Sequence, residues 1–116
     1  MKTKGYYIYK YVYNDEIIYI GKTNVCLVNR IDCHAREEKF KGYLDDCQIF
    51  YFECKNSAET TIMECYLINK YKPILNVSMK YSDNLNIDIP EPEWVCYKRN
   101  DFIQLNSNII YYYHSL

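Results

Sequence analysis

Five side chains stand out in this sequence because their types suit one kind of chemistry. They are two tyrosines, an arginine, a histidine and a glutamate: Tyr7, Tyr19, Arg30, His34 and Glu64. Hydrolysis of a phosphodiester needs an activated nucleophile, neutralisation of charge on the phosphate, help for the leaving group and correct placement. Phenol, guanidinium, imidazole and carboxylate groups can provide these functions together. The set therefore points to cleavage of a phosphodiester.

The elements that must position these groups begin with a predicted hairpin of residues 6–13 and 17–21, which are rich in Tyr, Val and Ile. Side chains alternate between the two faces of a strand. Tyr7 and Tyr19 therefore share a face only if the loop holds an odd number of residues or a bulge intervenes. Because one site needs both phenols, we predict a three-residue loop at 14–16 or a β-bulge.

A helix is predicted over residues 25–39, with Asn24 as its cap. Arg30 and His34 are four residues apart, so they lie on the same face of this helix. The buried stripe beside them is predicted to be Val28, Ile31 and Ala35.

A third strand is predicted at residues 48–54 and a second helix after Asn56, with Glu59 in the capping-box position. This helix is expected to end at about Tyr71, because the residue before Pro73 resists the helical conformation. The order ββαβα predicts an α/β fold of the α+β type. It consists of a small three-stranded, mostly antiparallel sheet flanked by helices.

The last part of the chain differs in character. Residues 1–80 hold 12 basic and 10 acidic residues, whereas residues 81–116 hold 2 and 5. We therefore predict two parts: a catalytic domain at 1–80, and an acidic linker with a short β-rich extension at 81–116. The short strands of the extension are expected at 94–98, 102–105 and 109–114.

Composition sets further bounds. A chain of 116 residues, 49% of them apolar, supports one folded domain. Its formal charge of −1 argues against tight nonspecific binding of nucleic acid, although a local basic face can still dock DNA. The six cysteines form no CxxC pair and are expected to be free, mostly buried thiols. No segment resembles a signal peptide or a membrane span, so a cytoplasmic location is expected, with no membrane partner.

Four strings of residues together resemble the GIY-YIG nuclease superfamily over about residues 5–77. Gly5-Tyr6-Tyr7 stands for its first motif, with tyrosine in place of the usual middle isoleucine. The later motifs are matched by Tyr19-Ile20-Gly21-Lys22-Thr23, by Arg30 to His34, and by Glu64 followed by Tyr71-Lys72-Pro73-Ile74-Leu75-Asn76. Each string is weak alone, but their order and spacing make a specific signal.

The resemblance implies a metal-dependent DNA endonuclease that uses one divalent ion, Mg²⁺ or Mn²⁺, and water as the nucleophile. Glu64 would hold the metal, and Mg²⁺ often takes one protein carboxylate with waters and phosphate oxygens. Tyr7 would be the general base and Tyr19 would bind phosphate or position water. Arg30 can clamp the phosphate through paired donors, and His34 can relay a proton or contact phosphate.

Further residues have supporting roles in this interpretation. Lys22 and Asn76 would support the site, and Lys22, Arg36 and Lys39 would face the DNA. A homodimer or a separate DNA-recognition partner is expected, since the chain has little room for a recognition domain. Two alternatives remain open: a noncatalytic nucleic-acid-binding module of the same fold, or a regulatory protein that acts through its acidic C-terminal segment.

Overall fold

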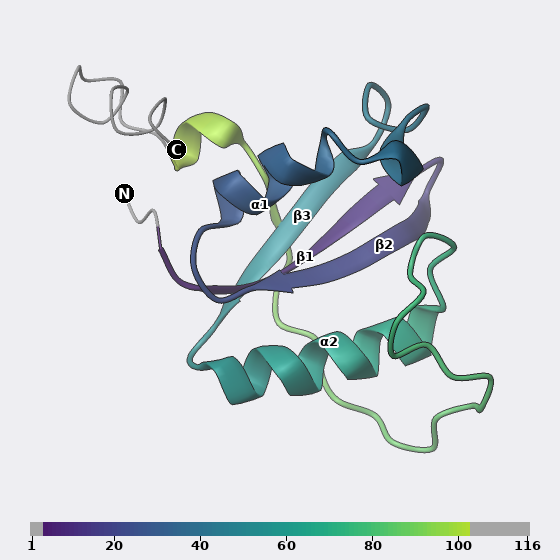
Figure 1. Ribbon diagram of the computed structural model, residues 1–116. Helices are drawn as coiled ribbons and strands as arrows, with labels where there is room; N and C mark the ends of the chain where they lie inside the picture. Colours follow the sequence, from purple (N-terminus) through teal and green to yellow (C-terminus); the bar gives the residue numbers. More distant parts are fainter. Residues whose placement is uncertain (1–3, 103–116) are drawn as a thin grey trace.

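The computed structural model describes residues 4–102 of the chain. Four strands form an antiparallel sheet in the order β2-β1-β3-β4. The strands are β1 (Tyr6–Tyr13), β2 (Glu16–Thr23), β3 (Gln48–Cys54) and β4 (Val95–Cys96). The helices α1 (Leu27–His34) and α2 (Ser57–Tyr71) lie on opposite faces of the sheet (Figure 1). The predicted α+β class is confirmed, and β4 adds a fourth strand to the predicted three.

The hairpin of β1 and β2 confirms the predicted bulge and not the three-residue loop. Asn14 and Asp15 form a two-residue turn, and both have the positive φ angles (51° and 65°) of the turn that favours hairpins. The register shifts after Tyr11, which pairs with Tyr19, so that Ile18 is the extra residue on β2. The bulge places odd-numbered tyrosines of both strands on one face.

The two faces of the sheet carry different cores. The face toward α1 is aromatic and includes Tyr9 and Tyr11, both fully buried. The face toward α2 is aliphatic and includes Ile8, Ile20 and Leu67. The alternation of side chains along β1 separates these two sets.

Helix α1 is shorter than predicted, because it ends at His34 and not at residue 39. His34 is fully buried, whereas Ala35, predicted to be buried, is exposed. The chain then turns through the 3₁₀ helix η1 (Glu38–Phe40), which places the fully buried Phe40 against the aromatic core. Asn24 does not cap α1; its Oδ1 accepts a hydrogen bond from Thr60 Oγ1 at 3.0 Å.

Helix α2 has the predicted ends. Asn56 Oδ1 accepts from the backbone N–H of Glu59 at 2.9 Å, and the Glu59 carboxylate accepts from the N–H of Lys55 at 3.0 Å. Lys72 ends the helix in the left-handed conformation, with φ of 50°, just before Pro73. None of the helices within residues 4–102 is long and apolar enough to cross a membrane.

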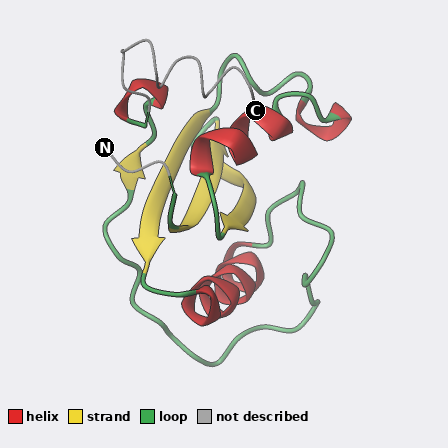
Figure 2. Ribbon diagram, turned by 60° about the vertical axis from the view of Figure 1, so that its left-hand side comes forward, coloured by secondary structure: helices red, strands yellow, loops and turns green. Residues whose placement is uncertain are grey.

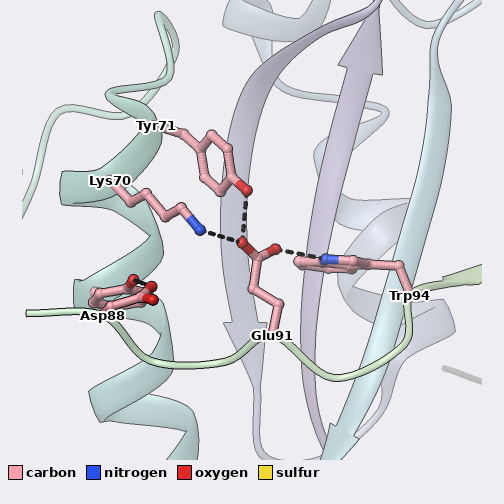
Figure 3. A network of polar contacts seen from close by, with 6 residues as sticks. Lys70, Tyr71, Asp88, Glu91 and Trp94 are labelled. Atoms are coloured by element: carbon pink, nitrogen blue, oxygen red, sulfur yellow. Dashed lines mark hydrogen bonds and ion pairs between the residues drawn. The ribbon is translucent and has the colours of Figure 1, made fainter.

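The chain after α2 forms a long loop, exposed over residues 81–88, and then returns to the sheet at β4 (Figure 2). Glu91 accepts hydrogen bonds from Lys70, Tyr71 and Trp94 at 2.7, 2.6 and 2.8 Å (Figure 3). The Trp94 ring packs on Phe52 with ring centroids 4.7 Å apart. Of the three strands predicted in this part of the chain, the first contains β4 and the other two fall almost wholly outside the described residues.

All six cysteines are free thiols. The prediction that most are buried was wrong, because Cys54 alone is buried, and Cys33 and Cys96 are exposed.

Candidate active site

The bulged hairpin brings two phenols together under α1. Tyr9 and Tyr19 lie on the same face with ring centroids 6.4 Å apart, and Tyr9 is fully buried. Burial raises the pKa of both phenols, so both are neutral near pH 7 in this environment.

Arg30 is the cation that both phenols face. It lies on α1 near the Tyr9 and Tyr19 hydroxyls, and its charge opposes the rise in their pKa values. The side chain is exposed, so its guanidinium stands between the buried phenols and solvent. The guanidinium group is always charged and can donate two parallel hydrogen bonds, so it suits an anionic substrate.

His34 extends the site inward from Tyr9. Its Nε2 lies 2.7 Å from the Tyr9 hydroxyl, and its Nδ1 lies 2.9 Å from Glu37 Oε1. Burial and the charge of Arg30 lower the pKa of His34, and Glu37 opposes that shift. The imidazole therefore rests as a neutral ring that is hydrogen-bonded on both sides.

Glu64 reaches the site from the other side of the sheet. It lies on α2, yet it is coupled electrostatically to Tyr9 and Tyr19 on the α1 face. Strand β2, against which α2 packs, is an edge strand of the sheet. Burial raises the pKa of the Glu64 carboxyl, while Lys22 and Arg30 lower it. A half-buried carboxylate with two cations nearby can bind a further cation together with a phosphate.

Gly21 makes room for the Tyr9 phenol. The two residues pair across β1 and β2, and a Cβ on Gly21 would lie 2.5 Å from the Tyr9 hydroxyl oxygen and 2.6 Å from Cζ. Atoms cannot approach so closely, so any side chain at this position would push the Tyr9 ring away from His34. The glycine of the second motif is therefore a steric requirement of the site.

Gly21→Ala is expected to destabilise the protein by about 1–3 kcal/mol, because overpacking displaces a buried ring. Urea unfolding measures this change, and the Tyr9 hydroxyl signal in NMR spectra reports its contact with His34. Glu16→Ala, an exposed position on the same strand, is the matched control. A Gly21→Ala protein with unchanged stability would contradict the steric account.

The structure does not bring Tyr7 to this cluster. Its ring packs edge-to-face on Tyr51 and Phe102, with centroids 5.8 and 6.0 Å away. Burial, followed by the charge of Glu53, raises the pKa of Tyr7 to about 12. Arg30, which opposes the shift at Tyr9 and Tyr19, is not among the groups that shift the pKa of Tyr7.

Tyr9 stands where Tyr7 was predicted, and the sequence holds a signal for it. Tyr7-Ile8-Tyr9 keeps the central isoleucine of the first motif, which Gly5-Tyr6-Tyr7 lacks. The alternation of side chains along β1 cannot show which of Tyr7 and Tyr9 belongs to the site, since both face α1. The cross-strand pairing with Gly21 does show it, because Tyr9 is the tyrosine opposite Gly21. Glu37 was also missed, because nothing in its spacing distinguishes it from a solvated glutamate.

Of the remaining predicted residues, Lys22 and Lys39 lie near the site and Arg36 does not. Lys22 donates to Thr61 Oγ1 at 2.9 Å and is one of the cations that act on Glu64. Lys39 lies over the Tyr19 ring at 4.6 Å. Arg36 is exposed, with its Nη2 3.6 Å from Cys33 Sγ, and no described contact links it to the phenols.

Asn76 is buried and binds the backbone of β2. Its Oδ1 accepts from the N–H of Ile20 at 2.9 Å, and its Nδ2 donates to the carbonyl of Ile20 at 2.8 Å. The neighbouring Leu75 N–H donates to the Ile18 carbonyl at 2.9 Å. Asn76 therefore fixes the segment between Tyr19 and Gly21, which flank Ile20.

Comparison with known proteins gives a consistent set of relatives, although no family model matches the chain. The chain is 37% identical over 71 residues to UvrABC system protein C of Clostridium acetobutylicum, and equally to that of Clostridium beijerinckii. These matches cover 56% of this chain and 11% of each relative, so the chain spans about a tenth of their length.

A crystal structure is similar over much of the fold. It is the GIY-YIG N-terminal endonuclease domain of UvrC from Thermotoga maritima, in a point mutant bound to its catalytic divalent cation. The TM-score is 0.57 with 26% identity, and the match covers 66% of this chain and 88% of that chain.

Proposed function

We propose, from the premise that this chain belongs to the GIY-YIG nuclease superfamily, that it is a metal-dependent endonuclease that hydrolyses DNA. The observation that carries the proposal is that Tyr9, Tyr19, Arg30 and Glu64 lie close enough to influence one another's pKa values, with the Tyr9 and Tyr19 rings 6.4 Å apart. These residues come from four separate elements, and a purely structural role does not require them to meet. The endonuclease domain of UvrC, with its catalytic divalent cation, supports the same function.

Glu64 fits the role of metal ligand. No group of three or more His, Cys, Asp or Glu side chains that could hold a metal occurs in the described part of the chain. A site with a single carboxylate suits Mg²⁺ or Mn²⁺, which keep several waters and take phosphate oxygens as further ligands. One divalent ion held by Glu64 would supply charge neutralisation at the scissile phosphate.

Arg30 is the phosphate clamp in this proposal. Its guanidinium now faces two neutral phenols, and a phosphate would offer it stronger, charge-assisted bonds. Tyr9 is fully buried, so the attacking water reaches its hydroxyl only if substrate binding opens a path to it.

Tyr9 takes the role of general base that the sequence suggested for Tyr7. It accepts a proton from the attacking water and passes its own proton to His34 Nε2, 2.7 Å away. This relay avoids a free phenolate, which would be present in about one part per thousand at pH 7 for an ordinary tyrosine. Tyr19 and Lys22 would contact the phosphate or the water beside it.

The test is cleavage of supercoiled plasmid in Mg²⁺ or Mn²⁺. Arg30→Ala is expected to lower the rate about 10²–10³-fold and Glu64→Gln by at least about 10³-fold, because each removes stabilisation of the transition state. EDTA should abolish cleavage by the unmodified protein. Glu93→Gln, an exposed acid in the C-terminal part, is the control, and circular dichroism checks the folding of each variant.

Gel shifts without nicking in either metal would contradict the proposal and favour a noncatalytic DNA-binding module. The remaining expectations belong to the same proposal: residues 1–80 as the segment that carries the nuclease site, a homodimer or a recognition partner, DNA contacts by Lys22, Arg36 and Lys39, and a cytoplasmic location.

A further inference from the structure

His34 is held on both sides in a way that the relay alone does not require. The ring is fully buried, and each of its nitrogens has one hydrogen-bond partner: Tyr9 at Nε2 and Glu37 at Nδ1. Glu37 is about one-third exposed and is oriented by its backbone, since its N–H donates to the His34 carbonyl at 3.0 Å. A carboxylate at the outer nitrogen constrains which nitrogen carries the proton.

A carboxylate can only accept a hydrogen bond, so the proton of a neutral His34 must sit on Nδ1, facing Glu37. This leaves the Nε2 lone pair to accept the O–H of Tyr9. The opposite tautomer would place a lone pair against the Glu37 carboxylate and a donor against a phenol that has a proton of its own. Glu37 thus decides the direction of the hydrogen bond between His34 and Tyr9.

The charged and titratable groups around His34 make Glu37 distinctive. Arg30 on the same helix and Lys39 from η1 both disfavour a protonated ring, and burial acts in the same direction. Within residues 4–102, the other titratable neighbours are the phenols of Tyr9, Tyr11 and Tyr19, whose rings pack against it. Among the groups that act on His34, Glu37 favours the imidazolium form.

We propose that Glu37 is a positioning residue that fixes His34 in the Nδ1–H tautomer and stabilises the imidazolium formed when Tyr9 passes on its proton. The inference rests on the proposed hydrolysis. The oxygen of water bonds to phosphorus, and a water proton moves to Tyr9 while the Tyr9 proton moves to His34 Nε2. The bond from phosphorus to the leaving oxygen breaks, and that oxygen takes a proton from solvent. The proton on His34 returns through Tyr9 to solvent after the products leave.

Nitrogen-15 NMR of the imidazole tests the tautomer without any need for activity. The chain has two histidines, so a His114→Gln variant isolates the signals of His34. We expect the Nδ1–H form in the unmodified protein, and a mixture of tautomers in Glu37→Ala. The neighbouring Glu38→Ala, which removes an exposed acid paired with Lys41, is the matched control and should leave the spectrum unchanged.

Cleavage kinetics test the role in the reaction. Glu37→Ala is expected to lower kcat about 10–100-fold with KM nearly unchanged, as for other groups that orient a histidine. Glu37→Gln keeps an acceptor but loses the charge, so it should retain the tautomer and recover part of the rate. It also replaces Glu37→Ala if that variant does not fold.

An Nε2–H tautomer in the unmodified protein would overturn the inference, as would Glu37 variants within twofold of normal kcat. If the unmodified protein cleaves nothing, the proposed hydrolysis fails. The NMR measurement still decides whether Glu37 sets the tautomer.

Discussion

Tyr9→Phe is expected to lower kcat/KM about a thousandfold, whereas Tyr7→Phe should change it less than threefold. The loss follows from removing the hydroxyl that is hydrogen-bonded to His34 and lies near Arg30, since general-base catalysis contributes about 10²–10⁴-fold. The pKa of the Tyr7 hydroxyl is raised to about 12, and neither His34 nor Arg30 is among the groups that act on it.

The two variants form a matched pair, because both delete one oxygen from a buried tyrosine on the same face of β1. Plasmid nicking at saturating Mg²⁺ gives the rates, and thermal unfolding shows whether each variant keeps its fold. The opposite order, with Tyr7→Phe inactive and Tyr9→Phe active, would return the base to the position predicted from sequence and would remove the relay through His34.

The second large effect concerns the C-terminal part. Replacing both Trp94 and Phe102 by alanine should lower the free energy of unfolding by about 5 kcal/mol, a substantial part of the stability of a typical domain. Phe102 is buried against Tyr7 and Tyr51 on the α1 face, whereas Trp94 covers Phe52 on the α2 face. The two sites share no partner, so their effects should add.

Urea unfolding of the single and double variants measures these effects. Ile87→Ala is the control, because this residue lies in the same segment but is exposed. A chain ending at residue 80 loses both aromatic contacts, the β4 pairing and the Glu91 network, so it should fail to unfold cooperatively. Full stability of that shorter chain would contradict this account and support an independent domain at 1–80.

The sequence predicted the parts of the fold that local chemistry determines. Strand patterning gave β1, β2 and β3, and the functional need for two phenols on one face led to the bulge. The capping box at Asn56 and Glu59 and the stop before Pro73 gave the ends of α2. These signals depend on neighbours within a few residues, which is why they can be read along the chain.

Features that depend on distant contacts could not be predicted. Helix α1 ends at His34, where the chain turns to bury Phe40 among aromatic rings from β1 and β2. The choice between Tyr7 and Tyr9 depends on which of them lies opposite Gly21, and that is a matter of register. Likewise, Glu37 can be recognised as a partner of His34 only when the burial of His34 is known.

The backbone contacts of Asn76 have one more consequence. Strand β2 is an edge strand, and the unpaired backbone groups of an edge strand are a template onto which another polypeptide can add. The Asn76 amide uses both main-chain groups of Ile20, and Leu75 N–H uses the carbonyl of Ile18, so these three groups are not available to an added strand. The same amide that steadies the phenol-bearing strand thereby blocks strand addition at Ile20.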